Sequence, residues 1–276
     1  GKMYRDGVGT AADQQTAARH FKDAYRGFVS LERQSHDDKL QYRLGWMLEK
    51  GVGTQQDIPA ALLFYEKAAG VGNPHAQYAW AKLILKDEHA APEQAAEAVA
   101  MLERAAEAGS GPAIYALAKL YRDGGAVKKD ITKAVELFEK AAADHKNDHA
   151  AYALGKLFYD CAELSKDIPT ALRWFEMAAN MGNQYAQYRL GKLLLKGDEI
   201  PRDVEAAMHR LSASADQGNQ FAQYALAMLS LKGEDAPKDV PVAAALLEQA
   251  AAQGNEYAAY QLGKLYLSGE DTPKDV

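Results

Sequence analysis

The sequence predicts an all-α protein, a right-handed α-solenoid of helix-turn-helix repeats. Two observations predict it: residue columns that recur at one fixed period, and apolar residues that recur at helical spacing inside each period. The aromatic column has spacings of 36 or 37 residues: Tyr42, Tyr78, Tyr115, Tyr152, Tyr188, Tyr224 and Tyr260. A small residue follows each of these tyrosines three positions later. Because one repeat cannot bury its apolar face alone, stacked repeats are expected to share a continuous core.

The first repeat, residues 1–44, is longer than the others. Ala24 precedes Tyr42 by 18 residues, whereas Ala68 precedes Tyr78 by 10. The additional residues lie within 25–40 and are expected to extend the second helix of this repeat by about two turns.

Each later repeat is expected to contain two helices. In the best-defined copies the second helix covers residues 171–179, with an apolar stripe at Ala171, Trp174, Phe175 and Ala178, and the next first helix covers 187–196. The pattern gives eight first helices and seven second helices, or about seven full repeats, in a single domain over 1–276. Because the chain starts within a first helix and stops at Asp275-Val276, where a second helix should begin, it is expected to be a fragment of a longer chain.

Turn residues mark the helix boundaries. First helices are expected to stop at a glycine in a left-handed conformation: Gly7, Gly51, Gly124, Gly197, Gly233 and Gly269. Asp87 and Cys161 take this place in two repeats; aspartate tolerates that conformation, and Cys161 should end its helix differently. Second helices are expected to start at an aspartate whose carboxylate accepts first-turn amides: Asp13, Asp57, Asp130, Asp167, Asp203 and Asp239.

Glycine recurs inside the first helices, at Gly45, Gly155, Gly191 and Gly263. Glycine in a helix interior costs about 1 kcal/mol relative to alanine. The column therefore predicts a close crossing of the two helices of a repeat, where no side chain fits. Substitution Gly191→Leu is expected to destabilise the fold by overpacking, by about 1–3 kcal/mol or more.

These columns resemble Sel-like repeats (SLR), which are relatives of the tetratricopeptide class. The resemblance rests on first helices of the form Ala-x-Tyr-x-Leu-Gly, a glycine stop, Asp-x-x-x-Ala, and a closing Ala-Ala-x-x-Gly-Asn, and residues 178–183 and 186–191 carry it best. It covers nearly the whole chain. It implies a protein-interaction scaffold whose first helices line a concave surface.

A narrower resemblance concerns residues 4–10, the long first repeat, and the copies of Gly-Asn-Gln-Tyr-Ala-Gln-Tyr. These are similar to Sel-like arrays that follow the relaxase domain in mobilisation proteins of Firmicutes. The sequence has no relaxase signature, so this resemblance implies an accessory region that helps a nuclease engage nucleic acid.

One arc of the first helices is rich in basic residues. Relative to the small column, positions −2, +1 and +5 fall within about 60° on a helical wheel. The arc contains Lys2, Arg43, Lys50, Lys82, Lys86, Lys119, Lys156, Arg189, Lys192, Lys196, Lys232 and Lys264, with the acids Asp6, Asp123 and Asp160. The residues expected to bind a partner are Arg43, Trp46, Lys82, Lys119, Lys156, Arg189, Lys192, Lys196, Met228, Lys232 and Lys264. Trp46 and Met228 would be apolar anchors.

The functional hypothesis is a concave, basic groove that binds an acidic or carboxylate-ended segment of another protein. The alternative is a solvated face whose lysine stems cover apolar neighbours. Nucleic acid is the less favoured partner, because the net charge is −6 and aromatic residues are not interleaved with the basic positions.

The sequence gives little support for catalysis, and no cofactor or metal is expected. His145 and His149 have ligand-like spacing, but the repeat places a turn between them. No histidine or aspartate can be assigned as a catalytic partner of Cys161. Because Cys161 is the only cysteine of the sequence, an internal disulfide is excluded. No phosphate loop or dinucleotide fingerprint occurs. No apolar run approaches the roughly 20 residues of a membrane helix, so no membrane insertion is expected.

Overall fold

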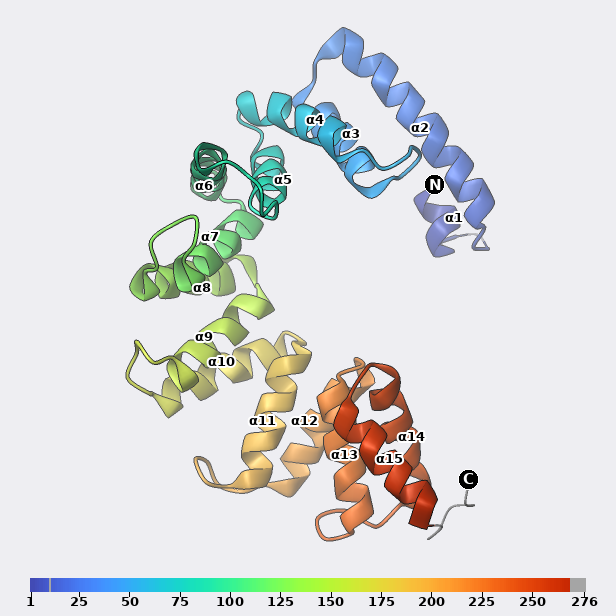
Figure 1. The fold of residues 1–276 in the computed structure, drawn as a ribbon, viewed down its shortest axis with the longest axis vertical. Coiled ribbons are helices and arrows are strands. Elements are labelled where there is room, and N and C mark those ends of the chain that lie inside the picture. Colours follow the sequence, from blue (N-terminus) through green and yellow to red (C-terminus); the bar gives the residue numbers. More distant parts are fainter. Residues whose placement is uncertain (10, 269–276) are drawn as a thin grey trace. The chain divides into compact units, whose positions relative to one another are not determined.

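The structure, a computed structural model, describes residues 1–9 and 11–268, and within them the regular structure is entirely α-helical (Figure 1). The odd-numbered helices are the first helices of the repeats: α1 (Lys2–Asp6), α3 (Asp38–Lys50), α5 (Pro74–Ile84), α7 (Gly111–Asp123), α9 (Asp148–Asp160), α11 (Gln184–Lys196), α13 (Gln220–Lys232) and α15 (Glu256–Ser268). The even-numbered helices are the second ones: α2 (Gln14–Ser35), α4 (Ile58–Gly70), α6 (Pro92–Glu107), α8 (Ile131–His145), α10 (Ile168–Asn180), α12 (Val204–Asp216) and α14 (Val240–Ala252). The predicted fold class and the pairwise arrangement of helices are confirmed.

The contacts divide the chain into two compact units, Gly1–Leu137 and Phe138–Val276, and the division falls inside α8. In the first unit, α2 packs against both α1 and α3, and α3 to α7 then pack each against the next. In the second unit, α9 to α15 continue the same sequential packing.

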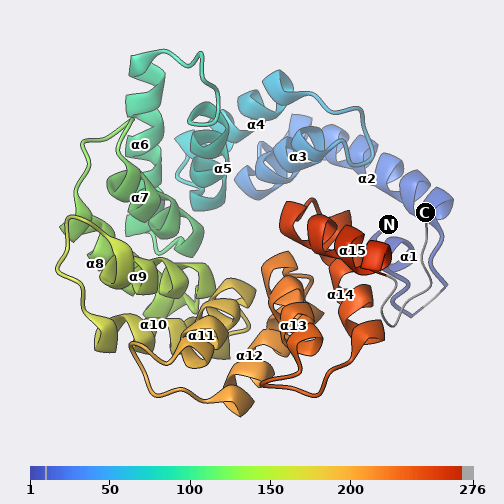
Figure 2. The same ribbon diagram turned by 60° about the horizontal axis from the view of Figure 1, so that its bottom comes forward.

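The second unit has two helical layers. Odd-numbered helices contact one another across repeats: Tyr152 of α9 packs against Tyr185 of α11, and Tyr188 of α11 against Phe221 of α13. In the other layer, Arg210 of α12 donates a hydrogen bond to Asn180 at the end of α10. Figure 2 shows α11, α13 and α15 following one another along one layer, with α10, α12 and α14 along the other. Side chains at equal repeat positions therefore lie on the same layer of this unit.

The predicted aspartate caps are confirmed. Each of the six aspartates accepts a hydrogen bond from the backbone amide three residues later, at 2.9–3.1 Å. These bonds fix where each second helix begins, because they satisfy an amide that has no partner inside the helix.

Most of the predicted helix ends are also confirmed. Left-handed glycines end α1, α3, α11 and α13, and Cys161 ends α9 in an extended conformation. Gly124 ends α7 as predicted, but its φ of 80° and ψ of −159° lie outside the left-handed helical region, so that part of the expectation is wrong. The expectation for Asp87 is wrong, because α5 ends at Ile84, and Leu85 caps it in a right-handed conformation. Gly269 and Asp275-Val276 lie outside the described residues.

Three glycines of the column, Gly45, Gly155 and Gly191, mark close helix crossings, as predicted. A Cβ atom on Gly155 would lie 2.4 Å from the ring of Phe175 on α10, and one on Gly191 would lie 2.7 Å from Leu211 on α12. In the first unit, a Cβ on Gly45 would lie 2.7 Å from the ring of Tyr65. The large side chains of the second helices are fully buried at these crossings. The missing side chain on the first helix thus makes room for the core residue of the second.

The longer first repeat is explained by α2, which has 22 residues where α4 and α10 have 13. Near its end the buried carboxylate of Glu32 accepts a hydrogen bond of 2.9 Å from Gln41 on α3. This bond lowers the pKa of Glu32 and joins the extended helix to the next repeat. No helix in the described part of the chain combines the length and apolar character needed to cross a membrane.

Candidate functional site

Four of the predicted partner-binding residues lie in the first unit. Arg43 and Trp46 are on α3, where Arg43 is exposed with its guanidinium 5.6 Å from the ring of Phe28, and Trp46 is half-buried. Lys82 on α5 and Lys119 on α7 are exposed. Each of the four therefore lies on an odd-numbered helix, as the repeat pattern requires.

The other predicted residues lie in the second unit, again on odd-numbered helices. Lys156 is on α9, Lys192 on α11, Lys232 on α13 and Lys264 on α15, and all four are exposed. None of the four forms an ion pair with another described residue. Met228 on α13 is half-buried. Lys156, Lys192 and Lys264 thus occupy one repeat position of this layer without an ion pair to a described residue, and Lys232 lies four residues after that position on α13.

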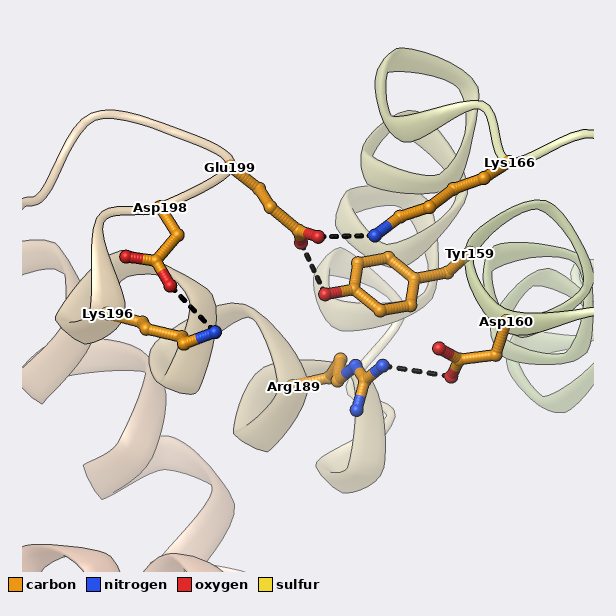
Figure 3. A network of polar contacts seen from close by, with 7 residues as sticks. All are labelled: Tyr159, Asp160, Lys166, Arg189, Lys196, Asp198 and Glu199. Atoms are coloured by element: carbon orange, nitrogen blue, oxygen red, sulfur yellow. Dashed lines mark hydrogen bonds and ion pairs between the residues drawn. The ribbon is translucent and has the colours of Figure 1, made fainter.

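Two of the predicted basic residues are neutralised instead (Figure 3). Arg189 donates a hydrogen bond of 2.9 Å to Asp160 on α9, and Lys196 lies 2.7 Å from the carboxylate of Asp198 in the following turn. A helical-wheel projection of α11 alone cannot reveal either ion pair. Asp160 belongs to α9 in the preceding repeat, and Asp198 lies after the end of α11. Arg189 and Lys196 are consequently less available to a partner than Lys156 and Lys192.

A polar cluster centred on Tyr159 lies beside these pairs. The Tyr159 hydroxyl donates a hydrogen bond to Glu199, whose carboxylate also lies 2.5 Å from Lys166. Arg189 and Lys166 both lie against the Tyr159 ring, at 4.3 and 4.7 Å from its centroid. Burial and the bond to Glu199 raise the pKa of Tyr159 to about 12, while Lys166 and Tyr159 lower the pKa of Glu199. The cluster ties the turn after α9 to the turn after α11.

Sequence reasoning missed a row of aromatic side chains that crosses the odd-numbered helices of the second unit. Between helices, ring centroids are 5.9 Å apart for Tyr152–Tyr185 and Tyr188–Phe221, and 6.4 Å apart for Tyr224–Tyr257. Within each helix the next ring follows three residues later, on the same face. We call the following residues the aromatic row: Tyr152, Tyr185, Tyr188, Phe221, Tyr224, Tyr257 and Tyr260.

Much of the aromatic row faces solvent. Tyr185 is 44% exposed, Phe221 49% and Tyr257 74%, although large aromatic side chains are usually mostly covered. The signal for the row is present in the sequence, because Tyr-x-x-Tyr or Phe-x-x-Tyr recurs once per repeat from residue 185 to 260. An exposed apolar row of this kind is typical of an interaction surface.

The lysines border the aromatic row. Lys156 and Lys192 each follow a tyrosine of the row by four residues, which places them on the same helix face. The ammonium of Lys264 lies 5.8 Å from the ring centroid of Tyr260, and in the first unit Lys119 lies 6.0 Å from that of Tyr115. The expectation that aromatic and basic positions are not interleaved is therefore wrong. It did not consider that a tyrosine and a lysine four residues apart in sequence lie on the same face of a helix.

The opposite layer of the second unit has a different surface feature. A hollow of about 240 Å³ lies between α8 and α10 and is lined by Glu139, Thr170, Arg173, Trp174 and Met177. It is small and carries both charge signs, so the geometry favours the odd-numbered layer as the candidate site.

The residues considered for metal binding and catalysis do not form a site. His145 ends α8, His149 lies in the first turn of α9, and Asn147 caps α9 between them. Among the described residues, no three His, Cys, Asp or Glu side chains gather closely enough to hold a metal ion. Cys161 is half-buried and its thiol lies 3.1 Å from the carboxylate of Glu163.

The family described as Sel1 repeat matches the chain in eight consecutive segments: residues 1–27, 39–73, 74–110, 111–144, 148–183, 184–219, 220–255 and 256–276. From residue 74 to residue 255, the segments follow the pairs of odd- and even-numbered helices, whereas the first segment ends inside α2.

Two solved structures show the same arrangement of helices. The crystal structure of a Sel1 repeat protein from Oxalobacter formigenes is 31% identical, with a TM-score of 0.78, over 96% of this chain and 73% of that one. The protein c5321, a protective antigen present in uropathogenic Escherichia coli strains displaying an SLR fold, is 26% identical, with a TM-score of 0.75. That match covers 99% of this chain and 57% of c5321.

Proposed function

Because the chain belongs to the Sel1 repeat family, whose arrays are typical of protein-interaction scaffolds, we propose that it is a non-catalytic scaffold that binds an acidic segment of another protein. The binding surface of the proposal is the odd-numbered layer of the second unit, where the aromatic row and its bordering lysines lie. In the first unit, the proposal includes Trp46, Lys82 and Lys119, at the repeat position of Lys156 and Lys192, and Arg43, at the repeat position of Arg189.

The proposal rests on the exposure of Lys156 and Lys192 and on their lack of ion pairs. Both side chains are exposed, occupy the same position in successive repeats, and form no ion pair with a described residue. Arg189 and Lys196 in the same arc are held by carboxylates. Repeated, unpaired charges of one sign on one surface attract segments of the opposite charge. The bordering aromatic rings supply apolar area, which carries most of the affinity in many interfaces.

A matched pair of charge reversals tests the proposal. The first variant is Lys156→Glu with Lys192→Glu, on the odd-numbered layer. The control is Lys140→Glu with Arg173→Glu, which changes the net charge equally at exposed positions on α8 and α10. Binding of a fluorescent peptide rich in glutamate and serine is measured by anisotropy, at low and high salt.

We expect the first variant to weaken binding at least tenfold and the control to change it less than twofold. Equal losses in both variants would show that only net charge matters and would overturn the proposed surface. Single-stranded oligothymidylate serves as a second probe, because basic residues beside aromatic rings also bind nucleic acid. Tight binding of this probe, with none of the peptide, would favour a nucleic-acid-binding accessory role instead.

A further inference from the structure

We propose that the aromatic row is a docking surface for a proline-rich, acidic segment in the polyproline II conformation. This inference rests on the proposed function, since it names the class of segment that the scaffold binds. It is carried by three features of the second unit: the hydroxyl groups of the row, the order of its rings across helices, and the lysines at its border.

The hydroxyl groups divide the tyrosines into two classes. Tyr65, Tyr159 and Tyr266 use their hydroxyls to bond glutamates of their own fold. The tyrosines of the row form no hydroxyl hydrogen bond with any described residue: Tyr152, Tyr185, Tyr188, Tyr224, Tyr257 and Tyr260. Burial raises the pKa of Tyr152 and of Tyr188, so these hydroxyls stay neutral and able to donate. The row thus presents unused hydrogen-bond donors beside apolar rings.

Tyrosine hydroxyls without a hydrogen-bond partner favour a ligand whose own acceptor groups are free. In an α-helical partner, the backbone carbonyls along the helix already accept intrahelical bonds. A polyproline II segment has no internal hydrogen bonds, so its carbonyls are free to accept from tyrosine hydroxyls. Its proline rings are also apolar and rigid, and they pack on aromatic side chains with little loss of conformational entropy.

The order of the rings fits the same conformation. The row places one pair of rings between each two neighbouring odd-numbered helices, at Tyr152–Tyr185, Tyr188–Phe221 and Tyr224–Tyr257. Polyproline II is extended and has three residues per turn, so every third residue of such a segment lies on the same side. An extended segment with a regular series of prolines can therefore contact rings on more than one helix. Acidic residues between the prolines would face the lysines that border the row.

The test compares three peptides of equal charge on the full chain. Four repeats of Glu-Pro-Pro favour polyproline II, four repeats of Glu-Ala-Ala favour a helix, and four repeats of Glu-Gly-Gly favour neither. We expect the first peptide to bind about tenfold tighter than the other two. Equal affinities would overturn the inference while leaving the proposed acidic-segment scaffold intact, whereas failure of all three peptides to bind would count against both.

Two variants test the hydroxyl groups without removing a ring. Phe221 is 49% exposed and is the member of the row without a hydroxyl, so Phe221→Tyr adds a donor at a position with room for it. We expect it to tighten Glu-Pro-Pro binding about two- to fivefold, and Tyr185→Phe with Tyr188→Phe to weaken it about threefold or more. Tyr25→Phe on α2 is the control and should leave the affinity unchanged. No change in either row variant would overturn the inference.

Discussion

Glycines at one register of the repeat have different surroundings. Gly155 lies under the fully buried ring of Phe175, so a Cβ atom there would overlap the ring. Gly263 occupies the same position in α15, but a Cβ atom there would meet no described atom within 4 Å. Among the described residues, a packing contact thus requires glycine at Gly155, whereas none requires it at Gly263.

Alanine substitutions at these two positions should have opposite effects. Gly155→Ala should lower the free energy of unfolding by about 1–2 kcal/mol, because overpacking outweighs the gain in helix propensity. Gly263→Ala should raise it by up to about 1 kcal/mol, because only the propensity changes. Urea unfolding followed by circular dichroism checks both. A stabilised Gly155→Ala would contradict the close crossing.

A second residue-scale prediction concerns Glu199. Hydrogen bonds from Lys166 and Tyr159 favour its carboxylate form and lower its pKa in the folded chain. The stability that this provides is complete above the ordinary glutamate pKa of about 4.3, and it is lost as the pH falls from there through the lower folded value. Glu199→Gln should therefore lose less stability than the wild type between pH 6 and pH 3.

The control for this prediction is Glu176→Gln, because Glu176 is exposed on α10 and forms no hydrogen bond or ion pair with a described residue. Thermal unfolding at a series of pH values measures the effect. If the profiles of the wild type and Glu199→Gln run parallel, the cluster contributes nothing to acid sensitivity.

At the scale of elements, asparagines cap several first helices but differ in their second contact. Asn183 accepts from the amide of Ala186 at 2.9 Å and donates to Asp148 of the preceding repeat at 2.9 Å. Asn219 accepts from first-turn amides in the same way, but its buried amide nitrogen has no partner among the described residues. In the repeat that precedes Asn219, Gln184 occupies the position that corresponds to Asp148, so Asn219 has no equivalent aspartate to bond. One cap therefore joins two helices, and the other serves its own helix alone.

Substitution of Asn183 or Asn219 by aspartate distinguishes the capping of a helix from the contact with the preceding repeat. Asn183→Asp keeps the cap but sets a second carboxylate against Asp148, so we expect a loss of about 2 kcal/mol or more at pH 7. Asn219→Asp removes the unpaired donor and places a charge at the positive end of the helix, so its stability should stay within about 0.5 kcal/mol of wild type or rise. Guanidinium titrations check both variants; equal losses would show that the contact with Asp148 is immaterial.

The elements were predictable because their signals are local and repeated. Aspartate caps, glycine stops and the extended α2 follow from residues within one repeat, and six copies of the aspartate cap reinforce one another. The end of α5 was missed because that helix stops before its stop column, at Ile84. The pairing of Arg189 with Asp160 and the aromatic row were missed because both depend on contacts between successive repeats. Such contacts need the register of neighbouring helices, which one repeat does not contain.

At the scale of the whole molecule, stability should be a sum of repeat terms and terms between neighbours. The single continuous solenoid over 1–276 stays a prediction. Gly45 packs against Tyr65 in the first unit, while Gly155 packs against Phe175 in the second. A defect at one of these crossings should stay local.

Hydrogen exchange with mass spectrometry checks this locality. In Gly45→Ala, a Cβ atom would press on the Tyr65 ring, so amides of α3 and α4 should exchange faster. Amides of α11 to α14 should keep their wild-type rates. Faster exchange throughout the chain would contradict a sum of local terms and indicate one fully cooperative fold.

The claim that the odd-numbered layer of the second unit is the binding surface is tested most directly by oxidative footprinting of side chains with and without the Glu-Pro-Pro peptide. Tyr185, Phe221 and Tyr257 are exposed on that layer, and Met177 and Met181, each 38% exposed, report on the end of α10 and its turn in the other layer. The account predicts strong protection of the three aromatic residues and unchanged oxidation of both methionines. Protection of the methionines with the aromatic residues unprotected would contradict it.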